Sequence, residues 1–207
     1  MTTTRIISTT QPDAVSQALN VIRTGGLIAF PTDTVYGLAA DFRNPEAIDR
    51  IYAAKDRDAG KPVAILIGEQ DHLSLVMDQL TPGAARLAAQ FWPGALTLIV
   101  PRKSDLPSNL SSLMTIGVRM PDHPWTLDLL RQTGPLATTS ANLSGKPDSK
   151  TADQVLENLQ GRFDLLLDGG ACPGGMPSTV VDCTGSDARI LRKGAITSKV
   201  IYEVWKK

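Results

Sequence analysis

Apolar runs alternate with amphipathic stretches along almost the entire chain. Short apolar runs bounded by glycine or proline are typical of buried strands, and apolar residues spaced three or four apart are typical of helices. The pattern predicts strands at residues 5–8, 27–31, 63–67, 96–100, 116–119, 136–138, 165–167, 179–182 and 189–191. It predicts helices at residues 13–23, 45–55, 72–79, 82–91, 125–132, 152–159 and 198–205.

This mixture of elements favours the α/β class, with a twisted central sheet and flanking helices. The later part of the chain is richer in strands than in helices, which predicts a mixed sheet. The sequence contains no internal repeat or long linker, so we expect one domain over residues 1–207. Residues 169–177 (GGACPGGMP) are dense in glycine and proline, and form either a flexible loop beside a site or an exposed connection.

The composition argues against several kinds of site. The 21 basic and 21 acidic residues cancel, so no overall field attracts nucleic acid, although a local basic cleft is still allowed. The two histidines, His72 and His123, are too few for a histidine metal site or a Ser-His-Asp triad, and we expect no metal site built by the protein. We place His123 in a solvated turn. Cys172 and Cys183 are expected to be reduced thiols.

The sequence shows no sign of membrane targeting. The first residues, MTTTRIISTTQPDA, lack the apolar segment of a signal peptide. No stretch approaches the length of a membrane span. We therefore expect a cytoplasmic protein that makes no membrane contact.

The first candidate for chemistry follows the predicted strand at residues 27–31. Thr32, Asp33, Thr34 and Tyr36 place three hydroxyls and a carboxylate within five residues. Loops at strand ends are where scaffolds present ligand-binding groups. A turn rich in Thr and Asp that caps the next element explains the same residues equally well.

The second candidate is a group of cations, Lys55, Arg57 and Lys61, on a short connector. Three cations within seven residues could converge on a polyphosphate. Charge runs usually face water, and Asp56 and Asp58 partly cancel this one. From the residues alone, a solvated loop is the favoured interpretation.

Two further candidates follow other predicted strands. Residues 137–145 (ATTSANLSG) carry small hydroxyl and amide groups that let a ligand approach the backbone closely, although an Asx or Ser/Thr turn before the helix near Thr151 is the alternative. The other candidate is a pair of predicted strands. The first, in residues 177–182, begins with polar residues, and the second, in residues 189–194, ends in cations. Arg119 lies between apolar neighbours, which argues against a solvent-exposed arginine that makes no specific contact. The sequence contains neither a Walker A motif nor GxGxxG.

Taken together, these segments resemble the YrdC family, the threonylcarbamoyl-AMP synthases of the tRNA t6A pathway. The resemblance runs in family order from residue 31 to residue 196, and an ordered set of this length is far more specific than any one string. The matching strings are PTDTVYGLAAD (31–41), KDR with KP (55–57 and 61–62), WPGALTLIV (92–100), GVRMP (117–121), TTSANLSGKP (138–147), PSTVVD (177–182) and ILRKGAI (190–196).

The resemblance implies a twisted sheet with a concave, basic cleft, in the short, single-domain form of the family. It implies a nucleotidyltransferase that makes L-threonylcarbamoyladenylate and pyrophosphate from L-threonine, bicarbonate and ATP, with Mg²⁺ on the phosphates. The product would pass to the t6A transferase machinery, with a possible contact to tRNA. The residues implied for ATP are Lys55, Arg57, Thr115, Ser140, Asn142 and Arg192, of which Lys55 and Arg57 would be catalytic. The residues implied for threonine or its carbamate are Thr32, Lys61, Arg119, Thr138 and Ser178.

The expected chemistry agrees with this set of residues. The carbamate formed from threonine and bicarbonate attacks the α-phosphorus, and pyrophosphate leaves. Such a transfer needs positioning and charge neutralisation, and no protein nucleophile. The chain departs from the family at Asp56-Arg57-Asp58, where a Gly-Arg-Pro-like turn is common, and so places extra negative charge near the phosphates.

Two rival functions stay open at this point. The first is a module that binds RNA, including double-stranded RNA, on a concave basic surface, although zero net charge and few aromatic residues argue against it. The second is a regulatory YrdC-like paralogue that binds nucleotide without making the adenylate.

Overall fold

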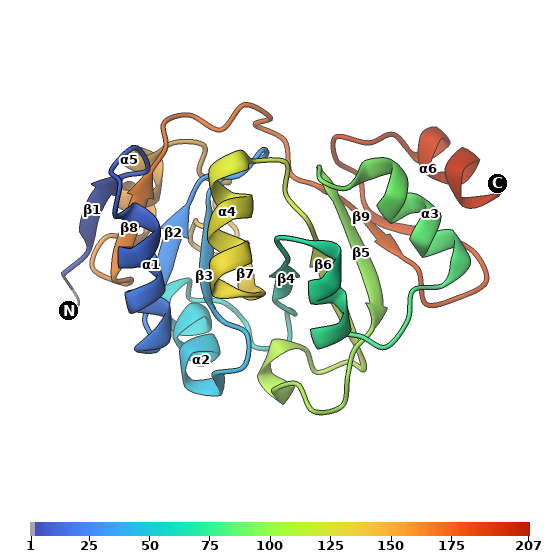
Figure 1. Ribbon diagram of the computed structural model, residues 1–207, viewed down its shortest axis with the longest axis horizontal. Coiled ribbons are helices and arrows are strands. Elements are labelled where there is room, and N and C mark those ends of the chain that lie inside the picture. The colour runs from blue at the N-terminus through green and yellow to red at the C-terminus, as the bar shows by residue number, and fades with distance from the viewer. Residues whose placement is uncertain (1–2) are drawn as a thin grey trace.

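The computed structural model describes residues 3–207, and in this range ten strands form one mixed sheet with helices on both faces (Figure 1). The order across the sheet is β1-β8-β2-β3-β7-β4-β6-β5-β9-β10. The strands are β1 (Arg5–Ser8), β2 (Ile28–Phe30), β3 (Gly37–Asp41), β4 (Ala64–Leu66), β5 (Leu96–Pro101), β6 (Thr115–Arg119), β7 (Leu136–Ser140), β8 (Leu165–Asp168), β9 (Thr179–Asp182) and β10 (Arg189–Arg192). The helices are α1 (Ala14–Arg23), α2 (Pro45–Ala54), α3 (Pro82–Phe91), α4 (Pro124–Thr133), α5 (Ala152–Leu159) and α6 (Ser198–Trp205), with 3₁₀ turns η1 (Gln70–Leu75) and η2 (Ser108–Leu110).

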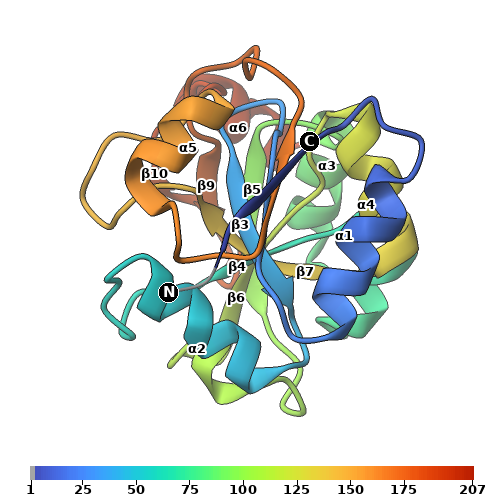
Figure 2. The ribbon, with the colours of Figure 1, turned by 90° about the vertical axis from the view of Figure 1, so that its left-hand side faces the viewer.

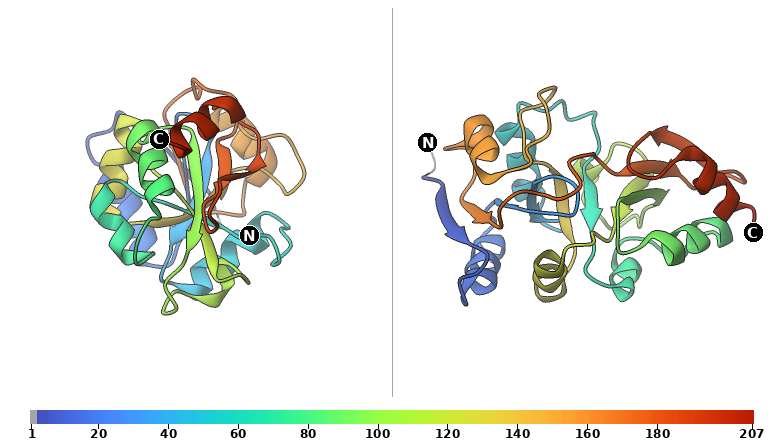
Figure 3. Two further views of the ribbon diagram at one scale, coloured as in Figure 1. Left: turned by 90° about the vertical axis from the view of Figure 1, so that its right-hand side faces the viewer. Right: turned by 90° about the horizontal axis from the view of Figure 1, so that it is seen from above.

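The pairing of the strands confirms the predicted mixed α/β sheet. Parallel pairs join β1 to β8, β8 to β2, β4 to β6 and β5 to β9. Antiparallel pairs join β2 to β3, β3 to β7, β7 to β4, β5 to β6 and β9 to β10. β1 and α6 lie at opposite ends of the molecule (Figure 3).

Strands such as β2 and β4 are apolar throughout because both faces of the sheet are covered. In β2, Ile28 and Phe30 pack into one core cluster and Ala29 packs into the other, as the alternation of side chains along a strand requires. Figure 2 shows α1 and α4 on one face and α2 and α5 on the other. The continuous apolar runs of the sequence therefore correspond to strands buried on both sides.

Helix starts follow capping rules that the sequence makes visible. α2, α3 and α4 each begin with proline, and the residue before each proline accepts a backbone N–H with its side chain. At α4 this residue is His123, which caps the helix through Nδ1 and is half-buried. The solvated turn expected at His123 is therefore wrong, because the ring is held against the helix start.

Besides the short turn η2, which was not predicted, two elements differ from the sequence prediction. β3 was not predicted, because Gly37 and the alanines that follow have low strand propensity; the strand forms because β2 and β7 supply hydrogen bonds on both of its edges. The helix predicted at residues 72–79 is wrong, since this region is the shorter η1. The N–H groups of Val76 and Met77 both donate to the carbonyl of Leu73, and the carbonyl of Val76 accepts the N–H of Lys103, so the last backbone groups of this region bond to a distant segment.

Within residues 3–207, the structure contains no helix whose length and apolar character would let it span a bilayer. Cys172 and Cys183 are free, buried thiols, as predicted.

Candidate functional site

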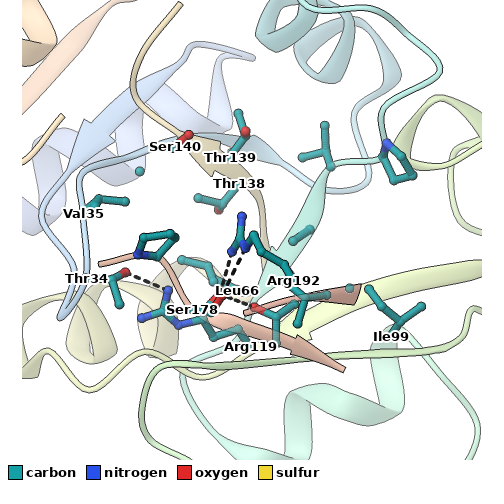
Figure 4. Close-up of a pocket in the computed structure, with 18 of the residues that line it drawn as sticks. Thr34, Val35, Leu66, Ile99, Arg119, Thr138, Thr139, Ser140, Ser178 and Arg192 are labelled. Carbon is teal, nitrogen blue, oxygen red and sulfur yellow. Dashed lines mark hydrogen bonds between the residues drawn. The ribbon is translucent and has the colours of Figure 1, made fainter. Parts of the chain in front are cut away.

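A cavity of about 490 Å³ lies where the ends of strands from both halves of the sheet meet (Figure 4). This volume is in the range of small-molecule sites. Part of its wall is smooth, because Gly37 and Gly117 expose backbone there; a Cβ on Gly37 would lie 2.9 Å from Cγ2 of Thr138. Eight of the eleven predicted site residues line the cavity: Thr32, Arg57, Thr115, Arg119, Thr138, Ser140, Ser178 and Arg192.

The segment after β2 is both a turn and part of the cavity wall. The hydroxyl of Thr32 donates to the carbonyl of Val35 at 2.7 Å and accepts the N–H of Thr34 at 3.1 Å. Both side chains are buried, and both residues line the cavity. The ligand-facing loop and the Thr- and Asp-rich turn, which the sequence left as alternatives, are therefore the same feature, because the turn fixes the hydroxyls that face the cavity.

Arg119 at the end of β6 is held by this turn. Its Nε donates to the carbonyl of Gly94 at 3.0 Å, Nη1 donates to Oγ1 of Thr34 at 2.9 Å, and Nη2 lies 2.5 Å from Oδ1 of Asp33. Burial lowers the pKa of Arg119, and the Asp33 carboxylate opposes that effect. A guanidinium has five N–H donors. Three are used by these bonds, so two are left for a ligand in the cavity that Arg119 lines.

A second cation enters the same region from β10. Arg192 donates from Nε to the carbonyl of Ser178 at 3.1 Å and from Nη2 to its hydroxyl at 3.0 Å. That hydroxyl also lies 2.8 Å from Oγ1 of Thr97. Figure 4 shows Arg119, Ser178 and Arg192 close together. The charge of Arg192 contributes to the lowered pKa of Arg119, as expected for two cations that face one space.

The turn after β7 differs from the expectation. The resemblance implies that Ser140 and Asn142 both contact ATP, but β7 ends at Ser140 and the chain turns there. The Ser140 hydroxyl donates to Oδ1 of Asn142 at 2.6 Å, and Nδ2 of Asn142 donates to the carbonyls of Leu143 and Lys146 at 3.1 and 2.6 Å. Ser140 lines the cavity, whereas Asn142 is buried behind it.

Lys55 lies beneath this turn and is not part of the cavity lining. It is 1% exposed, and its ammonium donates to the backbone carbonyls of Ser140 and Asn142 and, at 3.3 Å, to Oδ1 of Asn142. Its own carbonyl accepts the N–H of Ser144 at 2.9 Å. Burial, with a further contribution from Arg57, lowers the pKa of Lys55 to about 7. The expectation that Lys55 lies on an accessible surface is therefore wrong, because the turn covers it.

Arg57 reaches the cavity and Lys61 does not. The Arg57 guanidinium is folded over its own loop, donating to the carbonyls of Lys61 at 3.2 Å and Pro62 at 2.9 Å. Lys61 itself is exposed and outside the lining. The cation group at residues 55–61 is thus divided among the interior, the cavity wall and the solvent.

The charges of the lining favour an anion. Among the described residues that line the cavity, Arg57, Arg119 and Arg192 are cationic and Asp148 is anionic. Within residues 3–207 no cluster of three or more His, Cys, Asp and Glu side chains could hold a metal ion. A divalent ion bound here would therefore have to bring most of its ligands on the phosphates of a nucleotide.

Some lining residues were missed by the sequence reasoning. Thr97 interrupts an apolar strand, and its position between Leu96 and Leu98 was a signal that could have been used. Asp148 lies in a polar loop with no distinguishing pattern. Thr34 was recognised within its cluster, but its bond to Arg119 depends on a contact 85 residues away in the sequence.

Comparison with known proteins gives one consistent result. The Sua5/YciO/YrdC family model, described as "Telomere recombination", matches residues 20–194. The threonylcarbamoyl-AMP synthase of Bacillus subtilis is 41% identical over 201 residues, which are 96% of this chain and 58% of that protein. The chain therefore spans little more than half of that relative, and the single-domain form stays a prediction.

Two solved structures have the same fold. Pyrococcus abyssi Sua5 complexed with L-threonine superposes with a TM-score of 0.90 at 36% identity, covering 99% of this chain and 60% of that one. Escherichia coli YciO superposes with a TM-score of 0.85 at 27% identity, covering 98% of this chain and 100% of that one. The YrdC-like fold expected from the sequence is confirmed.

Proposed function

This chain belongs to the Sua5/YciO/YrdC family, and we propose that it is an L-threonylcarbamoyladenylate synthase, a nucleotidyltransferase that acts in tRNA t6A modification. The observation that carries the proposal is the cavity, where three arginines and several small hydroxyls converge. The name of the Bacillus subtilis relative and the L-threonine bound to Pyrococcus abyssi Sua5 support the proposed reaction and substrate.

The proposed reaction fits what these side chains can do. A carbamate oxygen, formed from the threonine amine and bicarbonate, attacks the α-phosphorus of ATP, and the bond to pyrophosphate breaks. Fixed cations stabilise the charge that develops on the phosphates. We assign Arg57 and Arg192, with Thr115 and Ser140, to ATP. We assign Thr32, Arg119, Thr138 and Ser178 to threonine and its carbamate.

Three residues take more distant roles in this proposal. Lys55 and Asn142, which the resemblance assigns to ATP, hold the turn that presents Ser140, because their polar groups are bonded to one another and to backbone. Lys61 is exposed and outside the cavity lining, so in this proposal it contributes positive charge near the cavity rather than a contact to threonine. Arg57 is then the catalytic cation of the loop.

The proposal extends to cofactor, partners and compartment. Mg²⁺ would enter on the phosphates of ATP and neutralise part of their charge. The product is a reactive mixed anhydride, so it would pass to the t6A transferase machinery in the cytoplasm. Contact with tRNA or double-stranded RNA stays a prediction, and the size of the cavity favours a small molecule.

The test is pyrophosphate release from ATP, measured with L-threonine and bicarbonate each omitted in turn. We expect release to require both, because the attacking group is built from them. Arg43→Ala, which removes an exposed cation remote from the lining, is the control for changes in charge. Release that continues undiminished without threonine would contradict the proposal. Nucleotide binding with no release would favour the regulatory paralogue.

A further inference from the structure

Residues 169–178, named here the strap, connect the two halves of the sheet. The strap leaves β8 and enters β9, and β2, β3, β7, β4, β6 and β5 lie between these strands. Figure 1 shows it in orange, passing over the top of the sheet. We propose that the strap positions Arg119 and Arg192 relative to one another, and that Gly174 is the positioning residue on which this depends. The kinetic part of the proposal rests on the proposed function.

The length of the strap leaves little slack. Neighbouring strands lie about 4.8 Å apart, so the seven steps from β8 to β9 would cover about 34 Å in a flat sheet. The eleven Cα steps from Asp168 to Thr179 reach about 36–40 Å when fully extended. Gly170 and Gly175 turn the strap, with φ of 78° and 57°, so its real reach is shorter. A strap of this length therefore spans the sheet with few residues to spare.

The middle of the strap is bonded to the turn that orients Arg119. The N–H of Gly174 donates to the carbonyl of Asp33, and the N–H of Gly175 donates to the carbonyl of Thr34, both at 3.0 Å. A Cβ on Gly174 would lie 2.4 Å from that Asp33 oxygen. Any larger residue would therefore push the strap away from the two residues that hold the Arg119 guanidinium.

The end of the strap is fixed beside Arg192. Ser178, its last residue, accepts both bonds from the Arg192 guanidinium. Gly194 packs against the backbone here, since its Cβ would lie 2.4 Å from the carbonyl oxygen of Pro177 and from the nitrogen of Thr179. One short segment thus contacts the supports of both arginines.

The beginning of the strap is anchored as well. Cys172 is 8% exposed, and its N–H donates to the carbonyl of Lys150 at 2.9 Å. The GGACPGGMP segment therefore lies beside the site, because Pro177 lines the cavity and these bonds hold the segment against the protein, although six of its nine residues are exposed. The buried thiol also provides a direct probe of whether the strap stays in place.

Two variants test the proposal. Gly174→Ala creates the overlap with Asp33, and insertion of two glycines after Gly170 adds up to about 7 Å of slack while keeping Gly174. The insertion point is open, since a Cβ on Gly170 would meet no atom within 4 Å. The control is Gly185→Ala, whose added Cβ would come no nearer than 4.0 Å to a neighbour, the carbonyl oxygen of Asp187.

Two measurements are made on each protein: alkylation of Cys172 by iodoacetamide, followed by peptide mass spectrometry, and the KM values for L-threonine and ATP. We expect both variants to label Cys172 faster and to raise the KM for threonine on the order of tenfold, with a smaller change for ATP. Gly185→Ala should change neither. An unchanged threonine KM in either variant that folds would overturn the proposal.

These measurements distinguish a failure of the strap proposal from a failure of the proposed function. If the wild-type protein releases no pyrophosphate, the synthase assignment fails and the labelling rate alone decides whether the strap is held as described. An unchanged labelling rate would then overturn the proposal. Melting curves followed by circular dichroism identify a variant that does not fold, in which case the other variant decides.

Discussion

The wall around Arg119 and the turn around Ser140 are built from the same kinds of groups but are used differently. Each combines a nearly buried cation with backbone carbonyls and polar side chains. Arg119 has more donors than its protein partners use, so part of its guanidinium is left for the cavity. Lys55 has three donors and three protein acceptors, so its ammonium is fully used inside the protein. A cation near a site is therefore judged by its unused donors, and not by burial alone.

The largest effect is expected at the Arg119 wall. Arg119→Ala leaves the Asp33 carboxylate, whose side chain is 13% exposed, without its partner. Removing one member of a buried ion pair typically destabilises by about 3–5 kcal/mol. We expect chemical denaturation to show a loss of this order, together with loss of pyrophosphate release.

The double variant Asp33→Ala with Arg119→Ala sharpens this prediction. Because it removes both charges, it should recover part of the stability and none of the activity. If the double variant were as unstable as Arg119→Ala alone, the unpaired carboxylate would not be the cause of the loss.

The next effect separates Arg57 from Lys55. Arg57→Ala should lower kcat/KM by an amount equivalent to a loss of about 2–4 kcal/mol in transition-state stabilisation. It should change the free energy of unfolding little, since Arg57 faces the cavity. Lys55→Met should lower the free energy of unfolding by about 1–3 kcal/mol, because buried carbonyls lose their donor. Urea unfolding and steady-state kinetics on both proteins check this division. Equal losses in the free energy of unfolding would contradict the distinction between Arg57, which faces the cavity, and Lys55, which holds the turn.

Most of the architecture could be predicted from the sequence, for identifiable reasons. Strands such as β2 and β8 are continuous apolar runs, and α2, α3 and α4 are marked by a capping residue followed by proline. β3 could not be predicted, because its glycine and alanines have little strand propensity and it forms only through backbone hydrogen bonds to the neighbouring strands β2 and β7. η1 could not be predicted either, because a backbone group at its end bonds to the distant Lys103.

The candidate site was predicted in composition and less well in geometry. Motif strings placed Thr32, Arg119, Ser178 and Arg192 together, and all four line one cavity. The strings could not show that Lys55 lies behind the turn, since nearby Arg57 reaches the cavity from the same connector. Which side of a turn a cation occupies depends on tertiary contacts that sequence spacing does not encode.

The smallest expected effect, measured per pH unit, is a pH dependence of stability that comes from Lys55. Its pKa is lowered in the folded protein to about 7, so between pH 7 and 9 the unfolded chain binds more protons than the folded one. The free energy of unfolding should therefore rise with pH over this range, by at most about 1.4 kcal/mol per pH unit. The thiol of Cys183, whose pKa burial raises to about 12, opposes the trend from the upper end of this range, because the unfolded thiol begins to lose its proton there, and Tyr36, whose pKa is also raised to about 12, opposes it at higher pH.

Subtraction isolates the contribution of Lys55. Urea unfolding at pH 7, 8 and 9 should give a rising difference between the wild-type protein and Lys55→Met, because the variant lacks the titrating group and keeps all others. Arg57→Ala serves as the matched control. Its free energy of unfolding should rise less steeply with pH than that of the wild-type protein, since the Arg57 charge contributes to the lowered pKa of Lys55. Parallel curves for wild type and Lys55→Met would mean that the three oxygens around the ammonium offset its burial. The turn would then be held by a permanently charged lysine, and the contrast with Arg119 would rest on donor number alone.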